Sequence, residues 1–147
     1  MKTKHIEELE KKVNPNTWIV LTVRQGIQND MSSFIPGSYL AYERAMKGFW
    51  NEVNRRLYGK RKLRRRKRII PNITVLERSY GGMWHIHACA KRPPHVTIEE
   101  FRQIVDDCCR RSRWFLPRRE VEDYRGGGVS YILKDGQDGI LVQACCF

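Results

Sequence analysis

The stretch NITVLERSYGGMWHIHACA, residues 72–90, decides the fold. Its two halves, residues 72–79 and residues 83–90, each alternate in polarity, and Tyr80-Gly81-Gly82 separates them. Two alternating runs around a glycine pair are typical of a β-hairpin. We therefore expect two antiparallel strands here, with the remaining elements arranged around them.

The segments on either side of the hairpin predict an α+β fold, because local hairpins occur in place of repeated strand–helix–strand units. We expect a central, mainly antiparallel sheet of about five strands with flanking helices. In chain order the other expected elements are a helix over 5–13, a central strand over 17–23, a loop from Gln25 to Gly37, a helix over about 38–58 capped by Ser38, a helix over about 97–111 capped by Thr97, a strand over 114–121 that Pro117 confines to a sheet edge, a short helix in VSYILK (129–134) and a strand over 140–146.

Composition indicates a single globular domain over residues 1–147. Hydrophobic residues make up 41% of the chain and aromatic residues 10%, which argues against a disordered basic tail. No apolar run approaches the ~20 residues that span a bilayer, so no membrane partner is expected. The five cysteines are odd in number and include two adjacent pairs, which suits reduced thiols inside a cell better than a disulfide framework.

The positive charge is concentrated in one segment. With 28 Lys and Arg against 16 Asp and Glu, the net charge is 28 − 16 = +12, which indicates a polyanionic partner. A solvated loop, a nuclear-import signal and a phosphate-contacting arm could all explain the segment, and we favour phosphate contact. It is KRKLRRRKR, residues 60–68, with Lys60, Arg61, Lys62, Arg64, Arg65, Arg66, Lys67 and Arg68 as its eight basic residues.

His85-Ile86-His87 is the most informative triplet for chemistry. Residues i and i+2 of a strand share a face, so both imidazoles could bind one divalent cation, although two histidines can also fall together by chance. A three-residue hairpin loop would place Glu77 opposite His85 on the same face, whereas a two-residue loop would turn it away. We expect the three-residue loop, which gives a mixed nitrogen and oxygen site suited to Mn²⁺ or Mg²⁺ bound to phosphate. The alternative is that Glu77 pairs with Arg78 or another strand residue.

Tyr131 and Lys134 are the second candidate pair. Residues i and i+3 share a helix face, so the phenol and the ammonium could address one phosphate together. A phenol is a weak nucleophile, but a metal-bound phosphate and an ammonium would make its attack on phosphorus feasible by neutralising charge. An ordinary amphipathic turn is the alternative for this pair.

In this order, the two motifs resemble those of the HUH endonucleases, specifically the single-tyrosine replication initiators (Rep proteins) of rolling-circle plasmids and viruses. That family carries a strand-borne His-hydrophobic-His followed by Tyr-x-x-Lys, and Trp18 to Val23 resembles its first apolar strand. The resemblance implies an HUH/RRM-like fold over 1–147, which is either a complete protein or the N-terminal part of a larger initiator.

The resemblance also implies an activity. Tyr131 would attack a backbone phosphate of single-stranded DNA, at an origin hairpin or a displaced strand, and would be joined to the 5′ phosphate. The metal held by His85, His87 and Glu77 would assist, and Lys134 would position the phosphate or aid proton transfer. A helicase or host replication proteins would be further partners, in a bacterial cytoplasm or a host nucleus. The rival hypotheses are a non-catalytic nucleic-acid-binding module with an RRM-like sheet and a basic structural protein.

Overall fold

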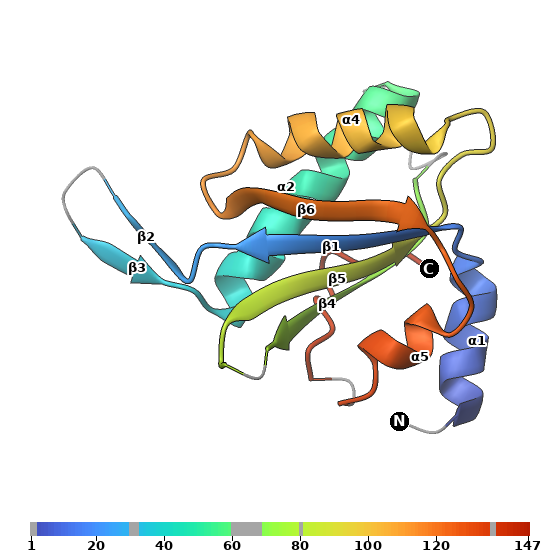
Figure 1. The fold of residues 1–147 in the computed structure, drawn as a ribbon, viewed down its shortest axis with the longest axis horizontal. Coiled ribbons are helices and arrows are strands. Elements are labelled where there is room, and N and C mark those ends of the chain that lie inside the picture. The colour runs from blue at the N-terminus through green and yellow to red at the C-terminus, as the bar shows by residue number, and fades with distance from the viewer. Residues whose placement is uncertain (1–2, 30–32, 60–68, 80, 136–137) are drawn as a thin grey trace.

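The computed structural model describes residues 3–29, 33–59, 69–79, 81–135 and 138–147, and these confirm an α+β fold with an antiparallel sheet and flanking helices (Figure 1). In spatial order the main sheet contains β4 (Asn72–Arg78), β5 (Trp84–Ala90), β1 (Thr17–Val23) and β6 (Phe115–Asp123). The described helices are α1 (Thr3–Val13), α2 (Tyr39–Tyr58), α4 (Ile98–Cys109) and α5 (Gly128–Ile132).

The hairpin of β4 and β5 has the register expected of a three-residue loop. The Ser79 N–H donates to the Met83 carbonyl at 2.8 Å, which closes the loop. Glu77 consequently lies opposite His85, as expected. Because side chains alternate across a strand, this register places the carboxylate and both histidines of the hairpin on one face of the sheet.

β1 is the central strand that its composition predicts, between β5 and β6. Its odd-numbered residues, from Thr17 to Val23, are buried against one face, and its even-numbered residues face the other side. β6 is an edge strand among the described residues, as expected from Pro117, whose ring cannot donate to a ladder. The residues of β1 and β6 that face the hairpin histidines' side are therefore Trp18, Val20, Thr22, Glu120 and Glu122.

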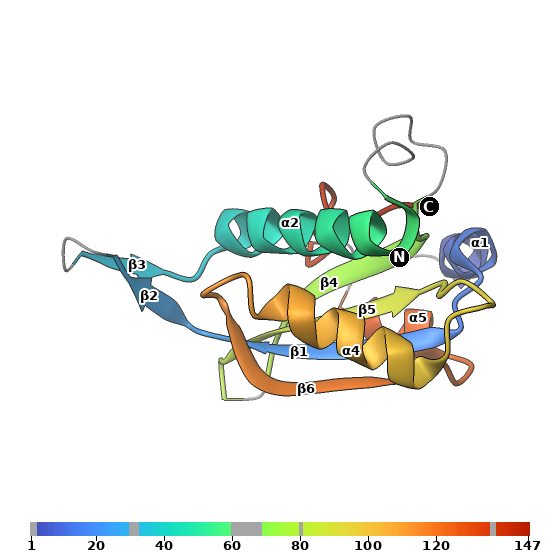
Figure 2. The same cartoon turned by 90° about the horizontal axis from the view of Figure 1, so that it is seen from above.

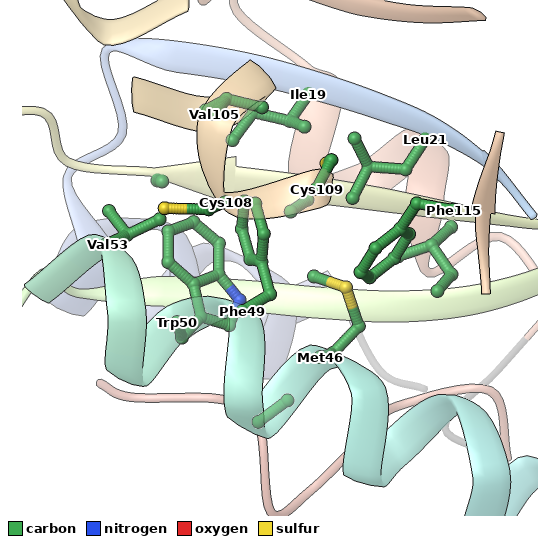
Figure 3. Packing of buried hydrophobic residues seen from close by; sticks show 14 of the residues in the cluster. Ile19, Leu21, Met46, Phe49, Trp50, Val53, Val105, Cys108, Cys109 and Phe115 are labelled. Carbon is green, nitrogen blue, oxygen red and sulfur yellow. The ribbon is translucent and has the colours of Figure 1, made fainter. Parts of the chain in front are cut away.

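The larger hydrophobic core lies between the sheet and the pair of helices α2 and α4 (Figures 2 and 3). Phe49 and Trp50 of α2 pack there with Ile19 and Leu21 of β1. Both predicted N-caps form, because the hydroxyl oxygens of Ser38 and Thr97 accept hydrogen bonds from backbone N–H groups at 3.1 Å. These two helices close one face of the sheet, so any site on the sheet surface must use the other face.

A smaller core covers part of that other face. It joins α1 and α5 to the sheet through Val13, Ile73, Val75, Cys89, Val129, Ile132 and Leu133. α5 and α1 lie side by side in Figure 1, and both are confined to one end of the sheet. The histidines of β5 and the neighbouring strand β4 lie beside this small core, and α5 contacts both strands.

The expected loop from Gln25 to Gly37 is wrong in part. Gly26–Gln28 (β2) and Phe34–Pro36 (β3) pair as a small antiparallel hairpin that projects from the sheet (Figures 1 and 2). The β-prone side chains of Ile27 and Ile35 lie opposite one another in it. Two three-residue strands are too short to show the alternation on which the sequence analysis relied.

The expected fifth strand over 140–146 is also wrong. This segment makes only isolated bridges to β4, between Asn72 and Cys146 and between Val75 and Ile140. Between them the chain forms a turn, in which the Leu141 carbonyl accepts from the Ala144 N–H at 2.9 Å instead of from β4, and side chains of α2 bind other peptide groups of the segment. The Tyr39 hydroxyl donates to the Ile140 carbonyl at 2.6 Å, and the buried Glu43 carboxylate accepts from the Gln143 N–H at 3.1 Å.

Two further findings bear on the class of protein. The five cysteines are all free thiols. None of the helices in the described parts of the chain is long and apolar enough to cross a membrane.

Candidate active site

Three side chains from the hairpin converge on one point. Oε2 of Glu77 on β4 lies 3.3 Å from Nε2 of His87 and 3.8 Å from Nε2 of His85, both on β5. The ligand atoms of all three lie within 4.8 Å of one another, so the group could hold a metal ion. The expected ligand set is therefore assembled by the hairpin register alone.

Polar atoms left without partners support a cation at this point. Oε2 of Glu77 and both ring nitrogens of His87 are buried and have no hydrogen-bond partner among the described residues. Leaving such atoms unpaired destabilises a fold, so buried polar atoms in proteins usually have a partner or a ligand. A cation bound to Oε2 and Nε2 would satisfy two of these three atoms together.

The surroundings of His87 lower its pKa and so keep the imidazole unprotonated, as a metal ligand must be. Burial is the main cause that lowers the pKa of His87 to about 4, and the charge of neighbouring His85 acts in the same direction. Glu77 opposes this shift and Lys134 adds to it. The imidazole is therefore neutral at physiological pH, and metal ligands must be unprotonated.

Lys134 links this cluster to Tyr131. Its ammonium lies 2.8 Å from Oε1 of Glu77 and 3.9 Å from the centre of the Tyr131 ring. The hydrogen bond to Glu77 is the largest cause of the raised pKa of Lys134, so the lysine stays charged. Lys134 lies just beyond α5, and its N–H donates to the Tyr131 carbonyl at 3.3 Å, which continues the turn. The helix over 129–134 is thus shorter than expected, but the two side chains still share a face.

Tyr131 lies at the open side of the cluster. Its side chain is 51% exposed, and its ring centre is 6.1 Å from that of His87 and 6.1 Å from that of Trp18. Substrate can therefore reach the Tyr131 side chain from solvent. The expected residues Glu77, His85, His87, Tyr131 and Lys134 are all brought together by β4, β5 and the turn of α5.

Tyr124 fixes where α5 begins, because its hydroxyl binds the first turn of that helix. The Tyr124 hydroxyl donates to the Glu10 carboxylate of α1 at 2.6 Å and accepts from the Val129 N–H at 3.1 Å. Burial, aided by that carboxylate, raises the pKa of Tyr124 to about 12. Tyr124 is therefore a protonated anchor between two helices, a role that its sequence context did not indicate.

A hollow of about 330 Å³ adjoins Tyr131. It is lined by Trp18, Tyr131, the glycine run 126–128, Glu122, Asp123 and Arg125. The sequence around Trp18 predicts only an apolar strand. Its even position in β1 could have placed it on the exposed face, but the pairing of β1 with β5 joins residues too distant in sequence to infer.

The predicted DNA-contacting residues of the basic segment 60–68 lie outside the described residues. Comparisons of this chain with known protein families, with curated proteins and with solved structures gave no significant match.

Proposed function

We propose that this protein nicks and rejoins single-stranded DNA through a covalent tyrosine intermediate, in the manner of the HUH endonucleases that its motifs resemble. The observation that carries the proposal is the convergence of a Glu/His/His group with an exposed tyrosine and a lysine from separate elements. Each short motif occurs by chance in many sequences, but their assembly at one point of a sheet is not expected of unrelated residues.

The reaction exchanges one phosphodiester for another. The Tyr131 oxygen attacks the scissile phosphorus, a bond forms between them, and the bond from phosphorus to the 3′ oxygen breaks. Tyr131 loses its phenolic proton, and the leaving 3′ oxygen takes up one proton to become a hydroxyl. The result is a 5′-phosphotyrosine and a free 3′ hydroxyl, and attack by a 3′ hydroxyl on the phosphotyrosine rejoins the strands.

The ligand set suits a divalent cation. His85, His87 and Glu77 would hold it, and imidazole with carboxylate is a donor set that accepts Mn²⁺ and, more weakly, Mg²⁺. Such an ion, when bound, polarises the scissile phosphate and stabilises charge on the leaving oxygen. The protein contributes the fixed orientation of the three side chains, which the paired strands β4 and β5 supply.

Lys134 would bind a non-bridging oxygen of the same phosphate. Its ammonium already lies against the face of the Tyr131 ring, so a phosphate reached by the phenol is also within reach of the cation. The positive charge of this ammonium near the attacked phosphorus would offset the charge that a phenolate brings. The basic segment 60–68 would hold the DNA backbone by charge alone, without reading its sequence.

A covalent adduct assay tests the proposal. The full chain is incubated with a pool of single-stranded DNA and Mn²⁺, and the products are resolved under denaturing conditions. We expect a protein–DNA adduct that EDTA abolishes. DNA binding without an adduct from any sequence in the pool would instead support the non-catalytic binding module.

A matched pair of histidine variants assigns the metal site. His87→Gln should remove Mn²⁺ binding, measured by calorimetry, together with the adduct. His95→Gln changes an exposed histidine of a loop and should leave both intact. Retained metal binding in folded His87→Gln protein would contradict the assignment of the ligands.

A further inference from the structure

The hollow beside Tyr131 is lined by the aromatic residue Trp18 and by the backbone of the glycine run 126–128. Trp18 lines it from β1, and a Cβ at Gly128 would lie 3.2 Å from two atoms of the Trp18 ring. Gly128 therefore passes close to the indole without a side chain of its own. A planar aromatic group and side-chain-free backbone together suit a flat ligand.

The indole is held in a fixed orientation. Its ring centre lies 5.3 Å from that of His87 and 6.1 Å from that of Tyr131, with tilted or edge-on geometry. Trp18 thus touches both the metal-ligand group and the nucleophile. A ligand stacked on it would lie immediately beside a phosphate attacked by Tyr131.

We propose that this hollow is a nucleobase subsite, which holds the base of a nucleotide adjoining the scissile phosphate. This inference rests on the proposed function for the position of that phosphate. A volume of about 330 Å³ lies at the small end of the roughly 300–1,000 Å³ range of ligand pockets, which suits one nucleotide and not a longer stretch. Base stacking on an aromatic side chain is the usual way in which proteins hold single-stranded nucleic acid.

The charged side chains of the subsite give it a preference among bases. Glu122 lies directly opposite Trp18 across the pairing of β1 with β6, and its carboxylate can only accept hydrogen bonds. Cytosine offers its exocyclic amino group as a donor to this carboxylate, whereas the single donor of thymine, N3–H, lies between two carbonyl oxygens that repel a carboxylate. We therefore expect cytosine to be preferred over thymine at this position, with Arg125 available to the sugar–phosphate backbone.

The first test measures nucleotide binding without catalysis. Deoxycytidine and thymidine 5′-monophosphates are titrated into the ¹⁵N-labelled chain, and the four indole N–H resonances are followed by NMR, with Trp18→Phe used for assignment. The Trp18 resonance should shift, with about fivefold tighter binding of the cytosine nucleotide. Glu122→Gln should remove that preference. Glu120→Gln, two residues along the same face of β6 and opposite Val20, should keep it.

A shift confined to other tryptophans, or a cytosine preference that survives Glu122→Gln, would overturn the subsite. The second test sequences the DNA joined to the protein in adducts from a random pool, and the nucleotide flanking the junction should be depleted in thymine. If adducts form but nucleotides do not shift the Trp18 resonance, the subsite is rejected and the proposed nuclease activity stands. Nucleotide shifts at Trp18 without adducts would reject the nuclease and leave the subsite standing.

Discussion

Glu77 is the residue shared by the two halves of the site. One of its oxygens lies 2.8 Å from the Lys134 ammonium and the other 3.3 Å from Nε2 of His87. A divalent cation bound beside His87 would meet the positive charge of Lys134 at short range. The ammonium and the metal therefore compete for one carboxylate, and the competition is weakened because Lys134 is partly exposed to solvent.

Replacing Lys134 with methionine should separate metal binding from catalysis. We expect Lys134→Met to bind Mn²⁺ about three- to tenfold more tightly, because a competing charge is removed. The same variant should form adducts more slowly, because the phosphate loses a cation. Calorimetry with Mn²⁺ measures the first effect, and Lys47→Met on the outer face of α2 controls for loss of one charge. Unchanged or weaker Mn²⁺ binding would contradict this account of Glu77.

Positions within one hairpin could be predicted from the sequence, whereas contacts between residues far apart in the chain could not. Glu77 could be placed beside His85 because a three-residue loop fixes the register of a hairpin. The contact of Lys134 with Glu77 could not, because it joins residues 57 positions apart. Trp18 shows the same limit, since no local pattern indicates which strand lies beside β1.

α5 is the shortest of the described helices, and contacts outside the helix fix where it begins. It begins after Gly127, whose φ of 87° is the left-handed conformation that glycine adopts at no steric cost. Tyr124 bonds to its first turn, and Gly128 allows the Tyr124 ring to pack against the backbone. Tyr131 is therefore aimed by a helix that could not hold its position alone.

A pair of glycine variants tests that support. A Cβ at Gly128 would lie 2.5 Å from Cε2 of Tyr124, so Gly128→Ala must displace the ring or the helix. We expect a loss of about 1–3 kcal/mol in the free energy of unfolding, measured with urea, and slower adduct formation. No described atom lies within 4 Å of a Cβ at Gly126, so Gly126→Ala should change stability by less than about 0.5 kcal/mol. Equal effects of the two substitutions would show that α5 does not depend on this packing.

The segment over 140–146, unlike the short local hairpin of β2 and β3, was mispredicted because tertiary contacts govern it. The apolar run from Ile140 predicted a strand, but Tyr39 and Glu43 of α2 bind the peptide groups of that segment. The helices and central strands were predictable because their own residues decide them, through periodicity, caps and a proline. A segment held by another element's side chains carries no such internal pattern.

In the whole molecule, an ion-pair network joins the two helices of the large core. Glu52 of α2 bonds to Arg55 and Arg56 and lies 3.4 Å from Arg111, which follows α4. The hydrogen bond from Arg55 is the main cause that lowers the pKa of Glu52 to about 2 from an ordinary 4.5. A carboxylate with a lowered pKa stabilises the folded state only while it is ionised.

The stability of the fold should therefore depend on Glu52 at acidic pH. Its contribution is complete above pH 4.5 and is lost as the pH falls from 4.5 toward 2. We expect Glu52→Gln to lower the free energy of unfolding by about 1–2 kcal/mol at neutral pH, with a shallower loss in that acidic window. Urea unfolding at a series of pH values measures this, with Glu120→Gln as the control. Parallel curves for wild type and Glu52→Gln would contradict it.

The basic segment 60–68 should make the affinity for single-stranded DNA depend on salt concentration. The segment 60–68 holds eight of the 28 basic residues, and without it the net charge falls from +12 to 12 − 8 = +4. Replacing all eight with glutamine should weaken binding to single-stranded DNA and flatten its salt dependence. The slope of log affinity against log salt should fall by up to about 5.6 if every charge contacts a phosphate. An unchanged slope would show that this segment does not bind the backbone.

The central claim is that Tyr131 becomes joined to DNA, and peptide mass spectrometry of the Mn²⁺-dependent adduct tests it most directly. After nuclease and protease digestion, the peptide that contains Tyr131 should carry a nucleotide linked through its 5′ phosphate. Tyr131→Phe should abolish the adduct, while Tyr124→Phe should still form it. A nucleotide on any other residue, or an adduct that persists in Tyr131→Phe, would contradict the account.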